Sequence, residues 1–346
     1  MRDLVALPKA HLHLHFTGSM RPATLAELAA ERGVRLPAAL LDGDPLHVPG
    51  DERGWFRFQR LYDAARAVVR DEDAMRRVVT EAVADDATEG SVRLEIQVDP
   101  TSYAPFVGGI TPAVEIVLDA ARQAAATHGI EVGVIVAASR LRHPMDARAL
   151  ARLAVRHAGS GSGEVIGFGL SNDERRGETE AFAPAFAIAG RAGLALVPHA
   201  GELLGPAHVD TVLDFLRPDR LGHGVRSVED PRVLDRVLEE QVVLEVCPAS
   251  NVSLGVYHQM IDVPLPSLVE AGARVALGAD DPLLFRSRLV DQYQAARDVF
   301  GLEDAALAAL ARSSVLASRA GPTTKATALA RVDAWLAGPA PSTSPA

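Results

Sequence analysis

The feature that most constrains the fold of this chain is a regular alternation between short apolar runs and longer amphipathic stretches. The apolar runs have the length of β-strands, and from residue 92 onward they are Val92–Val98, Val132–Ala138, Val165–Leu170, Leu194–Pro198, Arg220–His223, Val242–Val246 and Val275–Ala279. The stretches between them have helical length and include Pro112–Thr127, Asp146–Ala158, Glu180–Ala192, Val209–Leu216 and Pro231–Glu239. Strands that alternate with helices in this way are typical of a parallel sheet covered by helices.

One more strand is predicted between Pro8 and Gly18, where histidine and leucine alternate. Because successive side chains of a strand point to opposite faces, His11, His13 and His15 are expected on one face, with the leucines against a hydrophobic layer. With this strand the chain has eight strands, most followed by a helix, which favours a closed (β/α)8 TIM barrel of the α/β class. No glycine-rich phosphate-binding sequence follows the first strand, which argues against a dinucleotide-binding open sheet.

The length of 346 residues is within reach of one α/β barrel with insertions. We expect a single barrel domain over residues 1–320, with extra helices inserted after the first strand over about residues 20–88. Residues 321–346 are expected to hold a linker, a helix and a disordered tail: Gly321–Thr324, Lys325–Leu336 and Gly338–Ala346.

The inserted region begins with a predicted helix from about Ala23 to Arg32. Thr24 and Glu27 have the spacing of a capping box for its start. A surface loop follows over Asp42–Gly54, and then apolar residues recur at helical spacing: Trp55, Phe58, Leu61, Tyr62 and Ala65. We interpret this face as buried, and such a helix beside an active-site mouth can also be a lid.

Charge and residue usage exclude several classes of protein. The net charge of −10 argues against non-specific nucleic-acid binding, which needs a basic surface. A single cysteine, Cys247, excludes an internal disulfide and a cysteine-rich zinc site. Lysine occurs only at Lys9 and Lys325, which excludes a two-metal centre bridged by a lysine carbamate on a middle strand. No apolar run is long enough to span a bilayer, so a cytoplasmic protein without membrane partners is expected.

Polar residues collect directly after four of the predicted strands. They lie in His199-Ala200-Gly201-Glu202, Gly222-His223-Gly224, Cys247-Pro248-Ala249-Ser250-Asn251 and Asp280-Asp281-Pro282. Because a barrel gathers the C-terminal ends of its strands around one mouth, these segments should become neighbours. Three imidazoles and one carboxylate would then meet, a set that suits one zinc ion or a similar cation with room left for water. The four ligands would be His13, His15, His199 and Asp280.

Taken singly, each of these residues also has a purely structural interpretation. His199 could be a hydrogen-bonded core histidine, Glu202 could cap a helix, and His223 could be a turn residue. The aspartates before Pro282 could cap the next helix. Their shared position at the same end of consecutive strands favours a functional site over these alternatives.

Together these motifs resemble those of the adenosine deaminase family of the amidohydrolase superfamily, over nearly the whole chain. The matching motifs are Pro8-Lys9-Ala10, His13-Leu14-His15, Gly18-Ser19, Asp173-Glu174, His199-Ala200-Gly201-Glu202, Gly222-His223-Gly224, Cys247-Pro248 with Ser250-Asn251, and Asp280-Asp281-Pro282 with Phe285. The resemblance implies one zinc ion per chain, held by the same three histidines and Asp280. It implies Glu202 as the proton donor and His223 as the residue that assists the attacking water. Substrate contacts are implied for His15, Thr17, Asn172 and Asp281, the last of which would bind the purine.

The implied reaction is the hydrolysis of adenosine or 2′-deoxyadenosine to inosine or 2′-deoxyinosine plus ammonia, a step of purine and nucleotide metabolism with a small-molecule nucleoside as partner. The chemistry is physically consistent with these residues. Zinc can lower the pKa of a bound water to about 7, and a buried carboxylic acid such as Glu202 can protonate the purine ring nitrogen next to the attacked carbon.

Four positions depart from the family's usual pattern. Thr17 stands where an acidic residue usually contacts the ribose 5′-hydroxyl, Asn172 replaces a glycine, Gln97 an arginine, and His11 a residue that is often glutamate. A 5′-modified adenosine such as aminodeoxyfutalosine, met by Arg57 and Arg60 of the lid helix, is therefore an alternative substrate, as is free adenine. Remoter alternatives are another mononuclear metal amidohydrolase and a purine-binding protein without catalysis. The native metal and the oligomeric state stay open.

Overall fold

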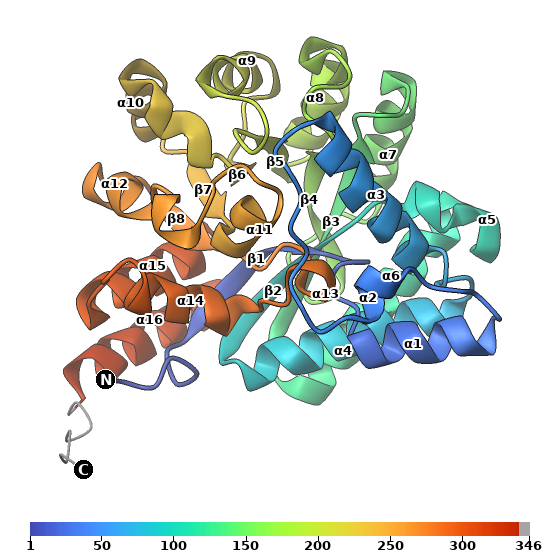
Figure 1. Cartoon of the computed structure of the whole chain (residues 1–346), viewed down its shortest axis with the longest axis horizontal. Coiled ribbons are helices and arrows are strands. Elements are labelled where there is room, and N and C mark those ends of the chain that lie inside the picture. Colours follow the sequence, from blue (N-terminus) through green and yellow to red (C-terminus); the bar gives the residue numbers. More distant parts are fainter. Residues whose placement is uncertain (339–346) are drawn as a thin grey trace.

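The computed structural model describes residues 1–338 and contains a parallel sheet of eight strands in which each strand pairs with the next along the chain. The strands are β1 Lys9–His15, β2 Ser91–Val98, β3 Glu131–Ser139, β4 Glu164–Ser171, β5 Ala195–Ala200, β6 Arg220–His223, β7 Val243–Val246 and β8 Val275–Leu277. After β8 the chain returns to β1, where Asp280 donates its backbone N–H to the carbonyl of His13 (3.0 Å) and accepts one from His15 (3.0 Å). The sheet thereby closes, and the predicted (β/α)8 barrel is confirmed (Figure 1).

Helices surround the strands and cover their apolar outer side (Figure 1). Those between successive strands from β2 onward are α5 Ala104–Val107, α6 Ile110–His128, α7 Pro144–Arg156, α8 Ala183–Arg191, α9 Pro206–Leu216, α10 Pro231–Glu239, α11 Pro248–Ser253 and α12 Leu265–Glu270. The chain after β8 forms α13 Pro282–Phe285, α14 Leu289–Asp298, α15 Asp304–Ala317 and α16 Pro322–Ala337. The sequence predicted all eight strands and the main helices, because apolar runs and 3.6-residue periodicity are both strong in this chain.

The segment between β1 and β2 carries four helices: α1 Pro22–Glu31, α2 Ala38–Leu41, α3 Glu52–Arg66 and α4 Glu72–Thr88. The predicted capping box at the start of the first helix is wrong. Pro22 occupies the first turn, where its fixed φ suits a helix start. The N-cap residue is Arg21, and its side chain accepts no capping hydrogen bond. The Thr24 hydroxyl instead donates to Glu81 of α4 (2.5 Å), so it joins two helices.

The C-terminal helix α16 begins earlier than expected. Pro322 starts it directly after Gly321, so the predicted linker over residues 321–324 is wrong, whereas the predicted helix is confirmed. Buried Ala328 of α16 packs with Ala10 and Leu12 of β1. Trp335 donates its indole N–H to the carbonyl of Asp3 (2.7 Å), which places the two ends of the described chain side by side (Figure 1). Of the predicted disordered tail, residues 339–346 lie outside the described part.

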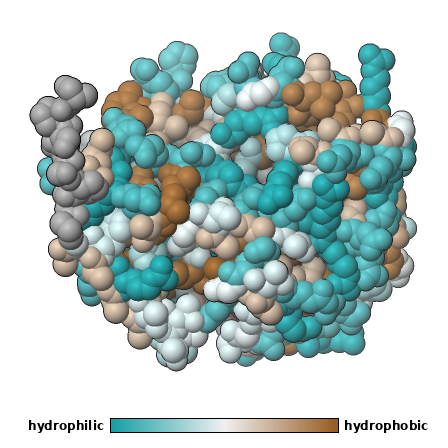
Figure 2. All heavy atoms as spheres, turned by 90° about the horizontal axis from the view of Figure 1, so that it is seen from below, coloured by the Kyte–Doolittle hydropathy of each residue, from teal (hydrophilic) through white to brown (hydrophobic). Residues whose placement is uncertain are grey.

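The surface gives no sign of a membrane-spanning segment in the part of the chain described. No helix within residues 1–338 has the length and apolar character needed to cross a bilayer. On the face shown in Figure 2, apolar residues form small patches separated by hydrophilic ones. The cytoplasmic location stays a prediction.

Candidate active site

Strand β1 brings two of its three histidines into the barrel. Its pairing with β2 shifts between His11 and Leu14, which is a β-bulge. A bulge adds one residue and so interrupts the alternation of faces. His13 and His15 face the barrel mouth, whereas His11 points outward and its Nδ1 lies 3.0 Å from Asp86 of α4. The expectation that all three histidines share one face is therefore wrong for His11.

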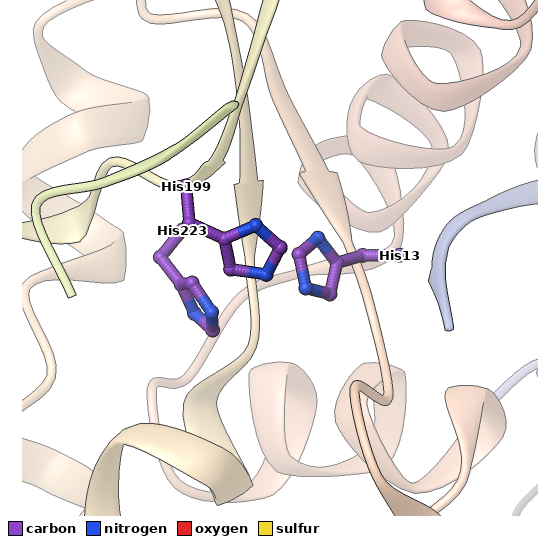
Figure 3. A group of neighbouring side chains, drawn as sticks. All are labelled: His13, His199 and His223. Atoms are coloured by element: carbon purple, nitrogen blue, oxygen red, sulfur yellow. The ribbon is translucent and has the colours of Figure 1, made fainter. Parts of the chain in front are cut away.

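The predicted ligand residues come together at the C-terminal mouth of the barrel. The Nε2 atom of His15 lies 3.2 Å from Nε2 of His199 and 3.2 Å from Oδ1 of Asp280. His13 Nε2 lies 3.5 Å from the same carboxylate oxygen. Figure 3 shows the rings of His13, His199 and His223 converging from different strands, and their ligand atoms also lie within 4.8 Å of one another.

Glycines make room for these rings. A Cβ atom on Gly222 of β6 would lie 2.9 Å from the His13 ring and 3.0 Å from the His199 ring. On Gly278 it would lie 2.6 Å from Cβ of His13. The glycine before His223 in the predicted motif is thus explained by close packing of the histidines over the backbone.

The electrostatics of this cluster favour a bound cation. Burial alone would raise the pKa of Asp280, but its close approach to His13 and His15 holds this pKa well below its usual range. Burial would likewise lower the pKa of His13, whereas the carboxylates of Asp280 and Glu245 raise it to about 10. Burial, followed by the charge of His13, lowers the pKa of His199 far below its ordinary value. The charged carboxylate of Asp280 and the neutral imidazole of His199 thus face one small space, beside a His13 ring whose raised pKa reports the excess of negative charge there.

The residues present fit a single metal ion. Among residues 1–338, the buried Nε2 atom of His13 has no hydrogen-bond partner, although its ring is fully buried. Imidazole nitrogens and one carboxylate oxygen are the donor set that zinc prefers. His13, His15, His199 and Asp280 could hold the ion, and His223 lies close enough to be a fifth candidate.

Two groups suited to proton transfer lie beside this cluster. His223 Nε2 is 3.5 Å from Oε1 of Glu202 and 3.9 Å from Oδ2 of Asp280. Burial, reinforced by the charge of Asp280, raises the pKa of Glu202 well above its usual range, which favours the protonated form of this carboxyl. Burial lowers the pKa of His223 to about 3, which keeps its imidazole neutral.

The loop that carries Glu202 is held by the Asp173-Glu174 motif, a role that was not predicted from the sequence. The buried carboxylate of Glu174 accepts backbone N–H groups from Glu202 (3.1 Å), Leu203 (2.9 Å) and Leu204 (2.7 Å). Arg140 donates to the carbonyl of His199 (3.0 Å) from the other side. The backbone on either side of the predicted proton donor is therefore fixed.

Asp281 lies next to the cluster at the start of α13. A Cβ atom on Gly18 would overlap the carboxylate of Asp281, so only glycine allows this approach. Burial, followed by the charge of Asp280, raises the pKa of Asp281 well above its usual range. Its buried Oδ1 has no hydrogen-bond partner within the described chain and is available to a ligand.

A cleft of about 730 Å³, including its open mouth, leads to these groups. Its wall is partly aromatic: Phe16, Trp55, Phe58, Tyr62 and Tyr103. Thr17 lines it, and its buried hydroxyl is hydrogen-bonded to the hydroxyl of Tyr103. Asn172 also lines it, in the left-handed backbone region with φ of 81°.

The lid helix α3 contributes to the cleft as expected, but through different residues than expected. Arg57 and Arg60 lie on its exposed side and do not line the cleft within the described structure. Arg66, near the end of the same helix, does line it. Helical periodicity explains the difference, because the aromatic positions define the inward face and Arg57 and Arg60 fall outside it.

Two residues of the site were missed by sequence reasoning. Tyr103 follows β2 and gave no signal beyond an isolated aromatic residue. Glu245 accepts a hydrogen bond from Nδ1 of His13 (2.7 Å). Its signal was available, since it is a charged residue in the middle of the apolar run Val242–Val246.

The fold and the polar cluster at its mouth together define an amidohydrolase-type barrel. The family profile described as adenosine deaminase matches residues 8–335, and the chain belongs to this family. The resemblance inferred from the motifs is thereby confirmed. The protein is accordingly an enzyme of the adenosine/adenine deaminase type, which hydrolytically deaminates an adenine-type substrate.

Individual relatives agree with this assignment. A putative adenosine/adenine deaminase of Streptomyces virginiae is 59% identical over 97% of this chain and 99% of its own length. An adenine deaminase of Mesorhizobium japonicum is 34% identical over 94% of this chain and 98% of its own. The crystal structure of adenine deaminase from Arthrobacter aurescens superposes with a TM-score of 0.86 at 29% identity, over 95% of this chain and 99% of that one.

Proposed function

We propose that this enzyme is a zinc-dependent hydrolytic deaminase with free adenine as its preferred substrate. The observation that carries the proposal is the contact between Thr17 and Tyr103. Thr17 is 1% exposed and its hydroxyl is hydrogen-bonded to the hydroxyl of Tyr103, so this position has neither a carboxylate nor a free hydroxyl for a ribose. The adenine deaminases of Mesorhizobium japonicum and Arthrobacter aurescens support the same substrate.

Zinc, held by His13, His15, His199 and Asp280, would supply Lewis-acid activation of a water nucleophile when bound. Glu202, whose buried carboxyl has a raised pKa, donates a proton to the ring nitrogen beside the carbon that carries the amino group. His223 stays neutral and accepts the proton of the attacking water, or orients that water. Its Nε2 lies 3.5 Å from Oε1 of Glu202.

Asp281 binds the imidazole-ring side of the base. The raised pKa of its carboxyl favours the protonated form, which can donate a hydrogen bond to a ring nitrogen there. With one acid on each side, the six-membered ring is oriented with its amino-bearing carbon toward the metal ligands. Ammonia then leaves, and a ring carbonyl replaces the amine.

A second candidate substrate is a nucleoside or a 5′-modified nucleoside. The lining of the cleft also includes the polar residues Gln59, Arg66 and Ser102, which could contact a sugar or an anionic group. A 25% identical structural neighbour, ADAL from Arabidopsis, was solved in complex with IMP. This reading keeps adenosine, 2′-deoxyadenosine and aminodeoxyfutalosine in the substrate panel.

The test compares kcat/KM for adenine and these three nucleosides. Turnover is measured as the release of ammonia and as the loss of adenine absorbance. We expect adenine to be preferred by roughly 100-fold or more, the discrimination that unpaired polar groups can impose. Thr17→Asp should improve adenosine relative to adenine, whereas Thr17→Ser, which keeps the hydroxyl, should not. A preference for adenosine that Thr17→Asp leaves unchanged would overturn the proposal.

A further inference from the structure

We propose that Glu245 is a positioning residue that fixes the tautomer and orientation of His13, and thereby sets the affinity of the enzyme for its metal. This inference rests on the metal site of the proposed function. Glu245 lies on β7, fully buried, and its Oε2 is 2.7 Å from Nδ1 of His13. A carboxylate accepts only, so Nδ1 donates to it and Nε2 is the ring nitrogen left to face the other ligands.

The second oxygen of Glu245 is paired with a buried arginine. Arg220 of β6 places Nε 2.7 Å from Oε1 of Glu245 and Nη2 2.7 Å from Oε2 of Glu95. Arg93 donates to the other oxygen of Glu95 (3.2 Å), and all four side chains are 0–2% exposed. Two cations and two anions thus alternate, and Glu245 is contacted at both oxygens, by His13 at one and by Arg220 at the other.

The network is also tied to the backbone of the C-terminal helices. Arg220 donates to the carbonyl of Ala317 at the end of α15 (3.1 Å), and Glu95 accepts the N–H of Arg319 (2.6 Å). These bonds leave Arg220 little freedom to move. His13 is therefore oriented by a chain of charged side chains that begins at Glu245 and Arg220. His199, in contrast, is oriented by the neutral carbonyl of Leu170 (3.1 Å).

The chain contains its own control for this proposal. His11, two residues earlier on β1, forms the same kind of buried pair, with Nδ1 3.0 Å from both oxygens of Asp86. That imidazole is not in the ligand group: its Nε2 accepts the N–H of Ala279 (3.1 Å) and lies 3.0 Å from the backbone carbonyl oxygen of His13. Loss of either carboxylate removes a buried histidine partner, but only Glu245 is bonded to a ring that faces the metal ligands.

The experiment compares Glu245→Gln with Asp86→Asn and the wild-type enzyme. Apo-protein is titrated with zinc(II) in competition with a chelating indicator, and zinc release is followed after excess chelator is added. We expect Glu245→Gln to weaken zinc binding by about 10- to 100-fold, the usual effect of removing such an outer partner. Asp86→Asn should stay within about twofold of the wild type, because its histidine is not a ligand.

Equal zinc affinity in the two variants would overturn the proposal. A readout that needs no variant at position 245 covers the case in which Glu245→Gln does not fold. In the ¹⁵N-histidine NMR spectrum of the zinc-loaded wild type, His13, assigned by the signal missing from His13→Asn, should keep its Nδ1 proton. A spectrum in which His13 lacks that proton would also refute it. Neither measurement involves turnover, so a wrong substrate assignment would not affect them.

Discussion

Among single residues, Glu202 illustrates how burial prepares a side chain for chemistry. Its carboxyl has a raised pKa because water is excluded and Asp280 lies nearby. If it is the proton donor, Glu202→Gln should lower kcat by about 10²- to 10⁴-fold, the usual contribution of a general acid. Steady-state assays and metal analysis check this: zinc should stay near one ion per chain. Unaltered turnover in this variant would remove Glu202 from its assigned role.

His208 provides a prediction about stability rather than activity. Burial, followed by the charge of Arg140, lowers its pKa from 6.5 to about 4 in the folded protein. Between these values the unfolded chain binds more protons, so the free energy of unfolding falls as the pH is lowered. We expect His208 to contribute a loss of about 2 kcal/mol between pH 7 and pH 5.

Urea unfolding of the wild type and His208→Gln at pH 7, 6 and 5 measures this contribution as the difference between their pH slopes. The other buried histidines are common to both proteins and cancel in the comparison. His208→Gln should show the shallower slope. Identical slopes would mean that the folded pKa of His208 is close to that of the unfolded chain.

The sequence predicted the histidines of the cluster better than the side chains that orient them. The spacing of His13, His15 and His199 relative to strand ends was enough to predict that these rings would meet. The outward turn of His11 depends on a bulge, which is a property of strand pairing and leaves no trace in the spacing of one strand. Glu245 was detectable, but its partner depends on which strands become neighbours.

At the scale of elements, strands were predicted more reliably than caps and connections. An apolar run identifies a buried strand by itself, whereas a helix start depends on competition between nearby residues. At α1 and α16 a proline determines where the helix starts. Pro22 starts α1 before the expected cap at Thr24, and Pro322 starts α16 within the expected linker.

The contact between the β1 loop and α13 gives a prediction at this scale. A Cβ atom at Gly18 would lie 2.7 Å from Cα of Asp281, so Gly18→Ala must displace the start of α13. We expect kcat/KM for adenine to fall by roughly 100-fold, the cost of a misplacement of about 1 Å, while zinc content is retained. Gly43→Ala is the matched control, because no atom of the described chain lies within 4 Å of its Cβ position. Similar kinetics for the two alanine variants would show that Asp281 need not be so tightly placed.

At the scale of the whole molecule, the polar cluster joins the two ends of the barrel. His13 and His15 belong to the first strand, whereas Asp280 follows the last strand and has φ of 61°, a backbone region that non-glycine residues rarely adopt. Two backbone hydrogen bonds hold Asp280 against β1, and its side chain is directed at the histidines. A cation bound there would contact both edges of the sheet at the point where it closes.

Removal of the metal should therefore affect stability as well as activity. A ligand that binds only the folded state stabilises it by about 2.7 kcal/mol at 100 times its dissociation constant. Dialysis against a chelator should abolish turnover and lower the urea midpoint, and added zinc should restore both. In Asp280→Asn, which weakens the ligand set, the chelator should shift the midpoint much less, since there is less bound metal to lose. A metal-free protein that is fully active, with the urea midpoint of the zinc form, would contradict both the catalytic and the structural role of the ion. The carboxylate and the imidazoles would then need no cation to lie this close together.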